Sequence, residues 1–206
     1  MILSTVGSMS LEEVTNVAPN SLRWMQLYVL SSQEMTKSIV QRAEKEGYKA
    51  IVMTVDATVR GKRQRDVSNH SFLLPYLMDI PNIEPAKVAD AKSSSNFEQN
   101  KQQSSGFVFD TFAKSLFDMS ITFETIQWLK NITKLPVLVK GILTADDARK
   151  ALEYGVDGII VSNHGGRQLD YVPATVSVIR EALANSIVYC LFLISHTFCF
   201  LREMVN

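Results

Sequence analysis

Short apolar runs alternate with amphipathic stretches along most of this chain. The apolar runs predict buried strands, and the stretches with apolar positions three and four residues apart predict helices. The predicted strands cover residues 1–3, 22–30, 49–55, 135–141 and 158–162. Because these runs are apolar on both faces and helical stretches separate them, the pattern predicts a parallel sheet with helical crossovers, which is an α/β fold.

Hydroxyl side chains mark where the predicted helices begin. Ser10 is followed three residues later by Glu13, the spacing of a capping box, and Ser32 and Thr144 stand directly before two further amphipathic stretches. Another helix is predicted near residues 123–132. The glycines expected to end the helices that begin at Ser32 and Thr144 are Gly47 and Gly155.

Residues 66–118 interrupt the alternation. Within them, residues 90–106 are rich in serine and glutamine, and such a stretch buries too little apolar area to order itself. The alternation resumes after residue 118. We therefore interpret residues 66–118 as a long loop or insertion inside one domain.

The charge balance, the cysteine content and the apolar stretches of the chain indicate which kinds of partner and environment are expected. Lys plus Arg and Asp plus Glu both number 21, so no overall field attracts nucleic acid, and no nucleic-acid partner is expected. The two cysteines, Cys190 and Cys199, suggest no disulfide framework and fit a reducing compartment. The apolar stretch 187–201 is interrupted by polar residues and is shorter than the ~20 residues of a membrane span, which disfavours a membrane anchor.

Polar side chains cluster where the predicted strands end. They are Gln26, Tyr28, Thr54, Asp56, Lys140, Ser162, His164 and Arg167. In a barrel of strands and helices, the chemistry lies at the carboxyl ends of the strands. Each residue alone also has a structural explanation, such as a small barrel filler or a cap of a turn. Their joint occurrence at successive strand ends favours a functional site.

The sequence of residues 162–170, Ser-Asn-His-Gly-Gly-Arg-Gln-Leu-Asp, resembles the active-site motif of the FMN-dependent α-hydroxy-acid oxidase and dehydrogenase family. The similarity is greatest to the animal (S)-2-hydroxy-acid oxidases of glycolate oxidase type. Supporting stretches follow in the family's order at residues 2–5, 26–28, 54–56 and 138–141. The resemblance implies a TIM (β/α)8 barrel and an enzyme that oxidises (S)-2-hydroxy acids to 2-oxo acids, with oxygen as acceptor and hydrogen peroxide as product.

The resemblance also implies roles for the residues that react with the substrate. His164 is the expected general base, and Asp56 hydrogen-bonds to it and stabilises the imidazolium. Arg167 and Arg63 are the expected ligands of the substrate carboxylate. Tyr28 is expected to hydrogen-bond to the substrate.

FMN is the cofactor that the resemblance implies, and no metal is expected. Lys140 would lie beside the flavin, where a fixed positive charge stabilises the reduced anionic form. The other residues expected to bind FMN are Ser4, Gln26, Thr54 and Ser162.

The family pattern also predicts an incomplete barrel, truncated at both ends. Residue 1 falls at about the second barrel strand, and the resemblance stops near residue 182, so about strands 2 to 6 are expected. Residues 1–182 would form this partial barrel, and residues 183–206 a divergent apolar tail. The family's later motifs, which hold the FMN phosphate, have no counterpart in that tail.

Two functions from different classes stay open at this point. In one, the chain is a fragment of a working oxidase; in the other, it is a non-catalytic truncated product that cannot hold FMN. A transcript whose reading frame extends upstream of Met1 favours the first, and an in-frame stop there with an intron boundary near Ala182 favours the second.

Location and assembly are implied by the family alone. The resemblance implies a peroxisomal homo-oligomer. The last residues, Met-Val-Asn, do not match a Ser-Lys-Leu type address, and without such an address the cytoplasm is the other expected location.

Overall fold

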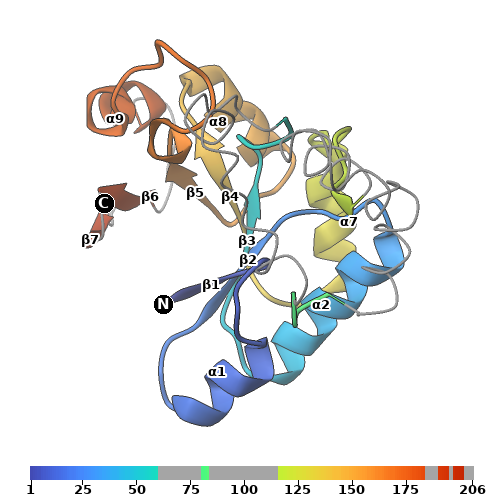
Figure 1. Ribbon diagram of the computed structural model, residues 1–206. Coiled ribbons are helices and arrows are strands. Elements are labelled where there is room, and N and C mark those ends of the chain that lie inside the picture. Colours follow the sequence, from blue (N-terminus) through green and yellow to red (C-terminus); the bar gives the residue numbers. More distant parts are fainter. Residues whose placement is uncertain (60–79, 84–115, 184–189, 195–196, 202–206) are drawn as a thin grey trace, which may run out of the picture. The chain divides into compact units, whose positions relative to one another are not determined.

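A computed structural model describes residues 1–59, 80–83, 116–183, 190–194 and 197–201 (Figure 1). The chain forms two compact units. The first consists of Met1–Tyr48 with Lys62–Met119, and the second of Lys49–Gly61 with Ser120–Asn206. Each unit therefore combines segments that lie far apart in the sequence.

The first unit contains two parallel strands, each followed by a helix. Its elements are β1 (Ile2–Ser4), α1 (Leu11–Val17), β2 (Trp24–Leu27) and α2 (Gln33–Lys45). Ser4 stands opposite Gln26 in the register of β1 and β2. Because the strands are parallel, their carboxyl ends lie at the same edge, so the polar residues predicted there become neighbours.

The second unit contains four parallel strands and a last strand that is antiparallel to the fourth. Its elements are β3 (Ile51–Thr54), α7 (Glu124–Ile132), β4 (Val137–Ile142), α8 (Ala145–Glu153), β5 (Gly158–Val161), the 3-10 helix η1 (His164–Gly166), α9 (Thr175–Leu183), β6 (Cys190–Ile194) and β7 (Thr197–Leu201). In the register, β4 pairs with both β3 and β5. Helices α7 and α8 contact β4, and α9 contacts β5 (Figure 1). The predicted α/β arrangement of parallel strands with helical crossovers is confirmed.

Burial explains why the strands of the second unit are apolar on both faces. All four residues of β3 and all four of β5 are buried. Full burial of a side chain such as Ile51 or Val52 stabilises the fold by about 1.5–3 kcal/mol. The buried strands thus fix the positions at which the polar residues that follow them begin.

The helices begin where the hydroxyl side chains predict. The Ser10 side chain accepts a hydrogen bond from the backbone of Glu13, whose carboxylate accepts one from the backbone of Ser10 in return. Ser32 accepts from the backbone of Met35, and Thr144 from that of Asp147. Each cap satisfies a backbone donor that the helix itself leaves without a partner.

Strand β2 is shorter than the predicted run at residues 22–30. Beyond Leu27 two backbone amides donate to threonine side chains. The amide of Tyr28 donates to Thr5 Oγ1 at 3.1 Å, and the amide of Leu30 donates to Thr36 Oγ1 at 2.9 Å. The apolar run therefore continues past the end of the strand ladder.

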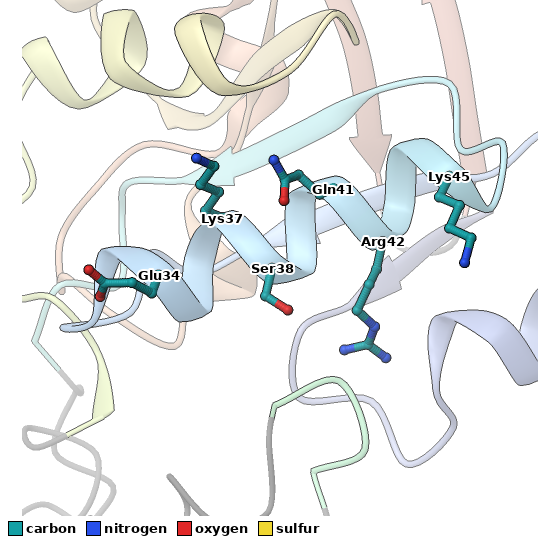
Figure 2. Close-up of a pocket in the computed structure, with 6 residues that line it drawn as sticks. All are labelled: Glu34, Lys37, Ser38, Gln41, Arg42 and Lys45. Atoms are coloured by element: carbon teal, nitrogen blue, oxygen red, sulfur yellow. The ribbon is translucent and has the colours of Figure 1, made fainter.

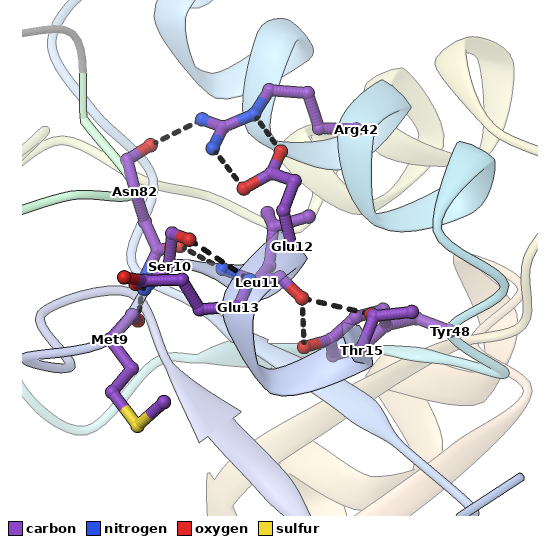
Figure 3. Close-up of polar contacts among 9 residues, drawn as sticks. All are labelled: Met9, Ser10, Leu11, Glu12, Glu13, Thr15, Arg42, Tyr48 and Asn82. Atoms are coloured by element: carbon purple, nitrogen blue, oxygen red, sulfur yellow. Dashed lines mark hydrogen bonds and ion pairs between the residues drawn. The ribbon is translucent and has the colours of Figure 1, made fainter. Parts of the chain in front are cut away.

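Asn82 ties the loop after β1 to the helices of the first unit, as Figure 3 shows in part. Its Oδ1 accepts from the amide of Leu11 at 2.9 Å, and its Nδ2 lies 3.3 Å from the carbonyl oxygens of both Ser4 and Met9. Its own carbonyl oxygen accepts from Arg42 at 3.0 Å. Because Asn82 is buried, replacing it would leave several of these groups without a partner.

Arg42 of α2 also binds Glu12 of α1 through two hydrogen bonds, from Nε at 2.7 Å and from Nη2 at 2.8 Å (Figure 3). This bidentate pair holds the two helices of the first unit together. The hydrogen bonds from Arg42 lower the pKa of Glu12, against the opposing effect of partial burial.

Arg23 is a buried cation whose hydrogen bonds go to uncharged oxygens. Its guanidinium donates to the carbonyl oxygens of Ala18 and Glu46, which are the C-caps of α1 and α2. It also lies over the ring of Tyr48, 5.5 Å from the centroid. A cation at these positions complements the negative ends of both helix dipoles.

The C-terminal segment forms two strands. Strands β6 and β7 pair in antiparallel fashion, and β6 pairs with β5 in parallel fashion. The division into a partial barrel at residues 1–182 and a tail at 183–206 stays a prediction. Most of the predicted insertion at residues 66–118 lies outside the described residues. None of the helices described has the length and apolar character that a membrane span requires.

Candidate functional site

The turn that follows β5 carries the central histidine of the site. His164 has a φ of 57°, a left-handed conformation that is uncommon for residues other than glycine, and Gly165 and Gly166 continue it with a φ of 68° each. Asn163 stabilises this turn, because its Oδ1 accepts from the amides of both glycines at 3.1 and 3.3 Å. The amide of His164 donates to Ser162 Oγ at 3.0 Å. Strained backbone of this kind is typical of functional sites.

His164 and Asp56 form a hydrogen-bonded pair at the carboxyl ends of β5 and β3. The distance from Nδ1 to Oδ1 is 2.8 Å, and both side chains are nearly buried, at 8% and 12% exposed. An ionised carboxylate only accepts hydrogen bonds, so the proton of the neutral imidazole belongs on Nδ1. Nε2 then carries the lone pair that a general base needs.

Lys140, at the end of β4, brings a cation to the same carboxylate. Its Nζ lies 3.9 Å from Asp56 Oδ1, and its side chain is 17% exposed. Burial lowers the pKa of Lys140; Asp56 raises it, and the positive charge of Arg167 lowers it further. Like-charge repulsion between Lys140 and Arg167 is relieved by binding an anion, which favours an anionic ligand at this site.

Arg167 is held beside the histidine by the same turn. Its Nε donates to the carbonyl oxygen of His164 at 2.8 Å. The amino groups at the far end of an arginine side chain form the planar fork that binds a carboxylate through two hydrogen bonds. The turn therefore positions a base and a carboxylate-binding group next to each other.

In the first unit, Gln26 organises the polar residues after β1. Its Oε1 accepts from Ser4 Oγ and from the amide of Thr5, both at 3.2 Å. A backbone amide can only donate, so the oxygen of the Gln26 side chain faces β1 and the orientation of its amide group is fixed. Thr5 Oγ1 donates to the Gln26 carbonyl oxygen at 2.7 Å.

Tyr28 lies just beyond β2 and is partly exposed. Its ring packs edge-on against Phe117, with 5.5 Å between centroids and 62° between planes. This edge-to-face arrangement is one that aromatic pairs prefer.

The structure brings together most of the residues predicted from the sequence. In the second unit, Asp56, Lys140, His164 and Arg167 form one cluster, with Thr54 and Ser162 buried at the neighbouring strand ends. In the first unit, Ser4 and Gln26 are in contact, and Tyr28 lies just beyond the end of β2. Arg63 lies outside the described residues. The roles assigned to all of these residues stay predictions.

Sequence reasoning missed four residues that support the site. Asn163 holds the histidine turn, Gly141 lies against Asp56, and Thr5 and Asn82 hold the loop after β1. An asparagine directly before the turn was the one available indication, because Asn is favoured where it caps exposed amides. The other three depend on contacts between distant parts of the chain.

Two hollows elsewhere contain none of the described residues assigned to catalysis or to FMN. One, of about 310 Å³, is formed by residues of α2 alone, most of them charged (Figure 2). The other, of about 260 Å³, has a mainly apolar lining from β3, β4, α7 and nearby segments. On β3 it is lined by Met53, which alternates with Thr54 and so faces the opposite side of the sheet.

Comparison with known proteins shows the family of the chain. The family model described as FMN-dependent dehydrogenase matches residues 1–187. The chain belongs to this family. 2-Hydroxyacid oxidase 1 of Mus musculus is 46% identical over 181 residues, which cover 88% of this chain and 47% of that protein. Peroxisomal (S)-2-hydroxyacid oxidase GLO3 of Arabidopsis thaliana is 44% identical over 183 residues, covering 89% of this chain and 46% of that protein.

Solved structures of similar proteins identify the fold of this FMN-dependent dehydrogenase family member. A mandelate oxidase in complex with (S)-4-hydroxymandelic acid matches with a TM-score of 0.77 and 33% identity, over 93% of this chain and 50% of that chain. A lactate oxidase of Pediococcus acidilactici matches with a TM-score of 0.71 and 31% identity, over 93% of this chain and 47% of that chain. The fold is thus part of a TIM (β/α)8 barrel, as predicted. The chain spans about half the length of the curated relatives that it matches.

Proposed function

We propose that this chain takes part in the oxidation of an (S)-2-hydroxy acid to the 2-oxo acid, with FMN as cofactor and oxygen as the final acceptor. The substrate loses two electrons and two protons, and oxygen takes up both to give hydrogen peroxide. The observation that carries the proposal is the 2.8 Å pair of His164 and Asp56 with Lys140 and Arg167 beside it. The names of the relatives support this function over that of a non-catalytic product.

His164 acts as the general base. The Nδ1–H group stays hydrogen-bonded to Asp56 while Nε2 takes up a proton from the substrate. The ring thereby becomes an imidazolium. Asp56 then stabilises the new positive charge and keeps the ring in one orientation. General base catalysis of this kind contributes about 10²–10⁴-fold to a rate.

Arg167 binds the substrate carboxylate. Its position beside His164 places the bound acid next to the base, because the same turn carries both side chains. We assign Arg63 to the carboxylate and Tyr28 to a hydrogen bond with the substrate, in agreement with the family resemblance. A substrate held at both ends loses the rotational freedom that otherwise slows the reaction.

The donor set of the chain fits FMN. Lys140 is a mostly buried cation whose carboxylate partner, Asp56, is already bonded to His164, so an acceptor-rich flavin edge suits it. We assign Ser4, Gln26, Thr54 and Ser162 to hydrogen bonds with the same cofactor. FMN supplies the two-electron acceptor that none of the protein side chains provides.

We further propose a peroxisomal location and a homo-oligomeric assembly for the complete protein. The printed name of the Arabidopsis relative supports the location. Assembly rests on the family resemblance described from the sequence.

The visible absorption spectrum tests the proposed function directly. The purified chain is mixed with FMN, freed of excess and then given an (S)-2-hydroxy acid without oxygen. A retained flavin band that bleaches supports the proposal. A folded chain that retains no flavin, or whose flavin does not bleach, overturns it for this chain. Arg149→Ala, which changes an exposed residue of α8 away from the cluster, is the matched control and should behave as the unchanged chain does.

A further inference from the structure

Gly141 lies closer to Asp56 than any other residue type allows. A Cβ atom at position 141 would lie 2.6 Å from Asp56 Cβ, 2.7 Å from Asp56 Cγ and 2.9 Å from the Asp56 backbone nitrogen. Carbon atoms that are not bonded to each other pack at about 3.5–4.0 Å. The backbone nitrogen and Cβ cannot rotate away, so only a shift of the Asp56 backbone makes room.

The backbone on both sides of this contact is fixed. The amide of Val55 donates to the Lys140 carbonyl oxygen at 2.9 Å, which ties the residue before Asp56 to the residue before Gly141. The β4 register shifts between Lys140 and Ile142, and Gly141 adopts a φ of +117° at this bulge. Bulges of this kind redirect side chains next to active sites.

We propose that Gly141 is a positioning residue for the His164–Asp56 pair. Its missing side chain lets Asp56 approach β4 closely enough to accept from His164 Nδ1 at 2.8 Å and to stay 3.9 Å from Lys140. A hydrogen bond of this length tolerates little displacement, since it weakens steeply as its geometry departs from the optimum. The inference rests on the proposed function only in naming His164 as the base.

Gly155 provides a matched control for backbone strain. Its φ is +83°, so replacing it by alanine also imposes an unfavourable conformation. The nearest atom to an added Cβ there is Lys130 Cδ at 3.9 Å, an ordinary contact. Gly155→Ala therefore also places alanine at a positive φ, but without any collision with Asp56.

The test uses nitrogen NMR of the histidine rings in the 206-residue chain without FMN. The sequence has 3 histidines, and the spectrum of His164→Gln identifies the resonances of His164. At a pH where the ring is neutral, we expect the unchanged chain and Gly155→Ala to carry the proton on Nδ1. Folded Gly141→Ala should lose this preference and show the mixed tautomers of a solvated ring. A folded Gly141→Ala with the Nδ1–H tautomer intact, or a Gly155→Ala that loses it equally, overturns the proposal.

A second variant covers the case in which Gly141→Ala does not fold. The double variant Asp56→Gly with Gly141→Ala removes the Asp56 Cβ and Cγ, the two closest contacts. Recovery of a folded chain supports the proposal. A double variant that folds no better than Gly141→Ala overturns it, because the backbone, and not the Asp56 side chain, would then require the glycine. The measurement needs no flavin, so it separates failure of this inference from failure of the proposed function, which the absorption spectrum reports.

Discussion

The two oxygens of the Asp56 carboxylate differ in what they do for His164. Oδ1 accepts from His164 Nδ1 at 2.8 Å, whereas Oδ2 is buried and has no hydrogen-bond partner among the described residues. Oδ1 therefore orients the imidazole ring through its hydrogen bond. The negative charge of the whole carboxylate lies next to the imidazole and Lys140. A substitution that removes the charge of Asp56 but keeps its shape should therefore affect the reaction differently from one that removes the whole side chain.

Asp56→Asn keeps the shape and removes the charge. The amide cannot stabilise an imidazolium as a carboxylate does, so we expect flavin reduction by substrate to slow by about 10²–10⁴-fold. The rate of anaerobic bleaching after rapid mixing of the FMN-loaded chain with substrate measures this. Asp146→Asn, at an exposed position of α8, is the control. An unchanged rate in Asp56→Asn would remove the pair from the mechanism.

Lys140→Met should change how stability depends on pH. Because burial lowers the pKa of Lys140 below 10.5, the folded chain gives up this proton at a lower pH than the unfolded chain does. The unfolded state then binds more protons between the two values, so the free energy of unfolding rises with pH in that range. Lys140→Met should lack this rise.

Urea unfolding at several pH values just below 10.5 tests the prediction. Lys37→Met, at an exposed position of α2, should keep the pH dependence of the unchanged chain. A Lys140→Met variant with the same rise would show that Lys140 is not the group responsible.

Arg23→Met should destabilise the first unit strongly. It removes the guanidinium that donates to the part-buried carbonyl oxygens of Ala18 and Glu46 and that complements the negative ends of both helix dipoles. We expect a loss of about 2–4 kcal/mol in the free energy of unfolding, measured in urea. Arg149→Ala breaks an ion pair whose side chains are 48% and 79% exposed, and should cost at most about 0.5 kcal/mol. Equal losses in the two variants would contradict this account of Arg23.

Glu12→Gln should flatten the acid side of the stability profile. Arg42 lowers the pKa of Glu12 below 4.5, so the pair contributes its full stability above that value and loses it as the pH falls through the lowered pKa. The side chains are 30% and 37% exposed, and solvent screening limits the effect to about 0.2–1 kcal/mol. Unfolding measured across the acid range should show a smaller pH dependence in the variant than in the unchanged chain. A steeper dependence would contradict the assignment.

Local chemistry explains what could be predicted from the sequence. The caps Ser10, Ser32 and Thr144 bond to amides within three residues, so their effect is visible in a short stretch of sequence. The clustering of polar residues at the strand ends could be predicted because the carboxyl ends of parallel strands lie at one edge of the sheet. That rule predicted that Asp56 and His164 lie near each other, but it could not predict the distance between them.

Long-range packing explains what could not be predicted. Asn82 looks like an ordinary turn residue, and only the folded chain shows that it bonds to the loop after β1. Arg23 looks like a surface residue at a strand start, yet it is buried against two helix ends. Gly141 matters because it lies against Asp56, which follows another strand, and no local pattern reveals that contact.

The pair of Asp56 and His164 joins residues separated by 108 positions, whereas β4 and β5 are linked by a Val137–Asp157 hydrogen bond across 20. Closing a loop of about 100 residues costs about 4 kcal/mol in its length-dependent entropy alone, more than closing one of about 20. During folding we therefore expect β4, α8 and β5 to assemble early and β3 to join them later. The Asp56–His164 pair is then among the last contacts to form, so much of the second unit should be structured before the proposed base meets its carboxylate partner.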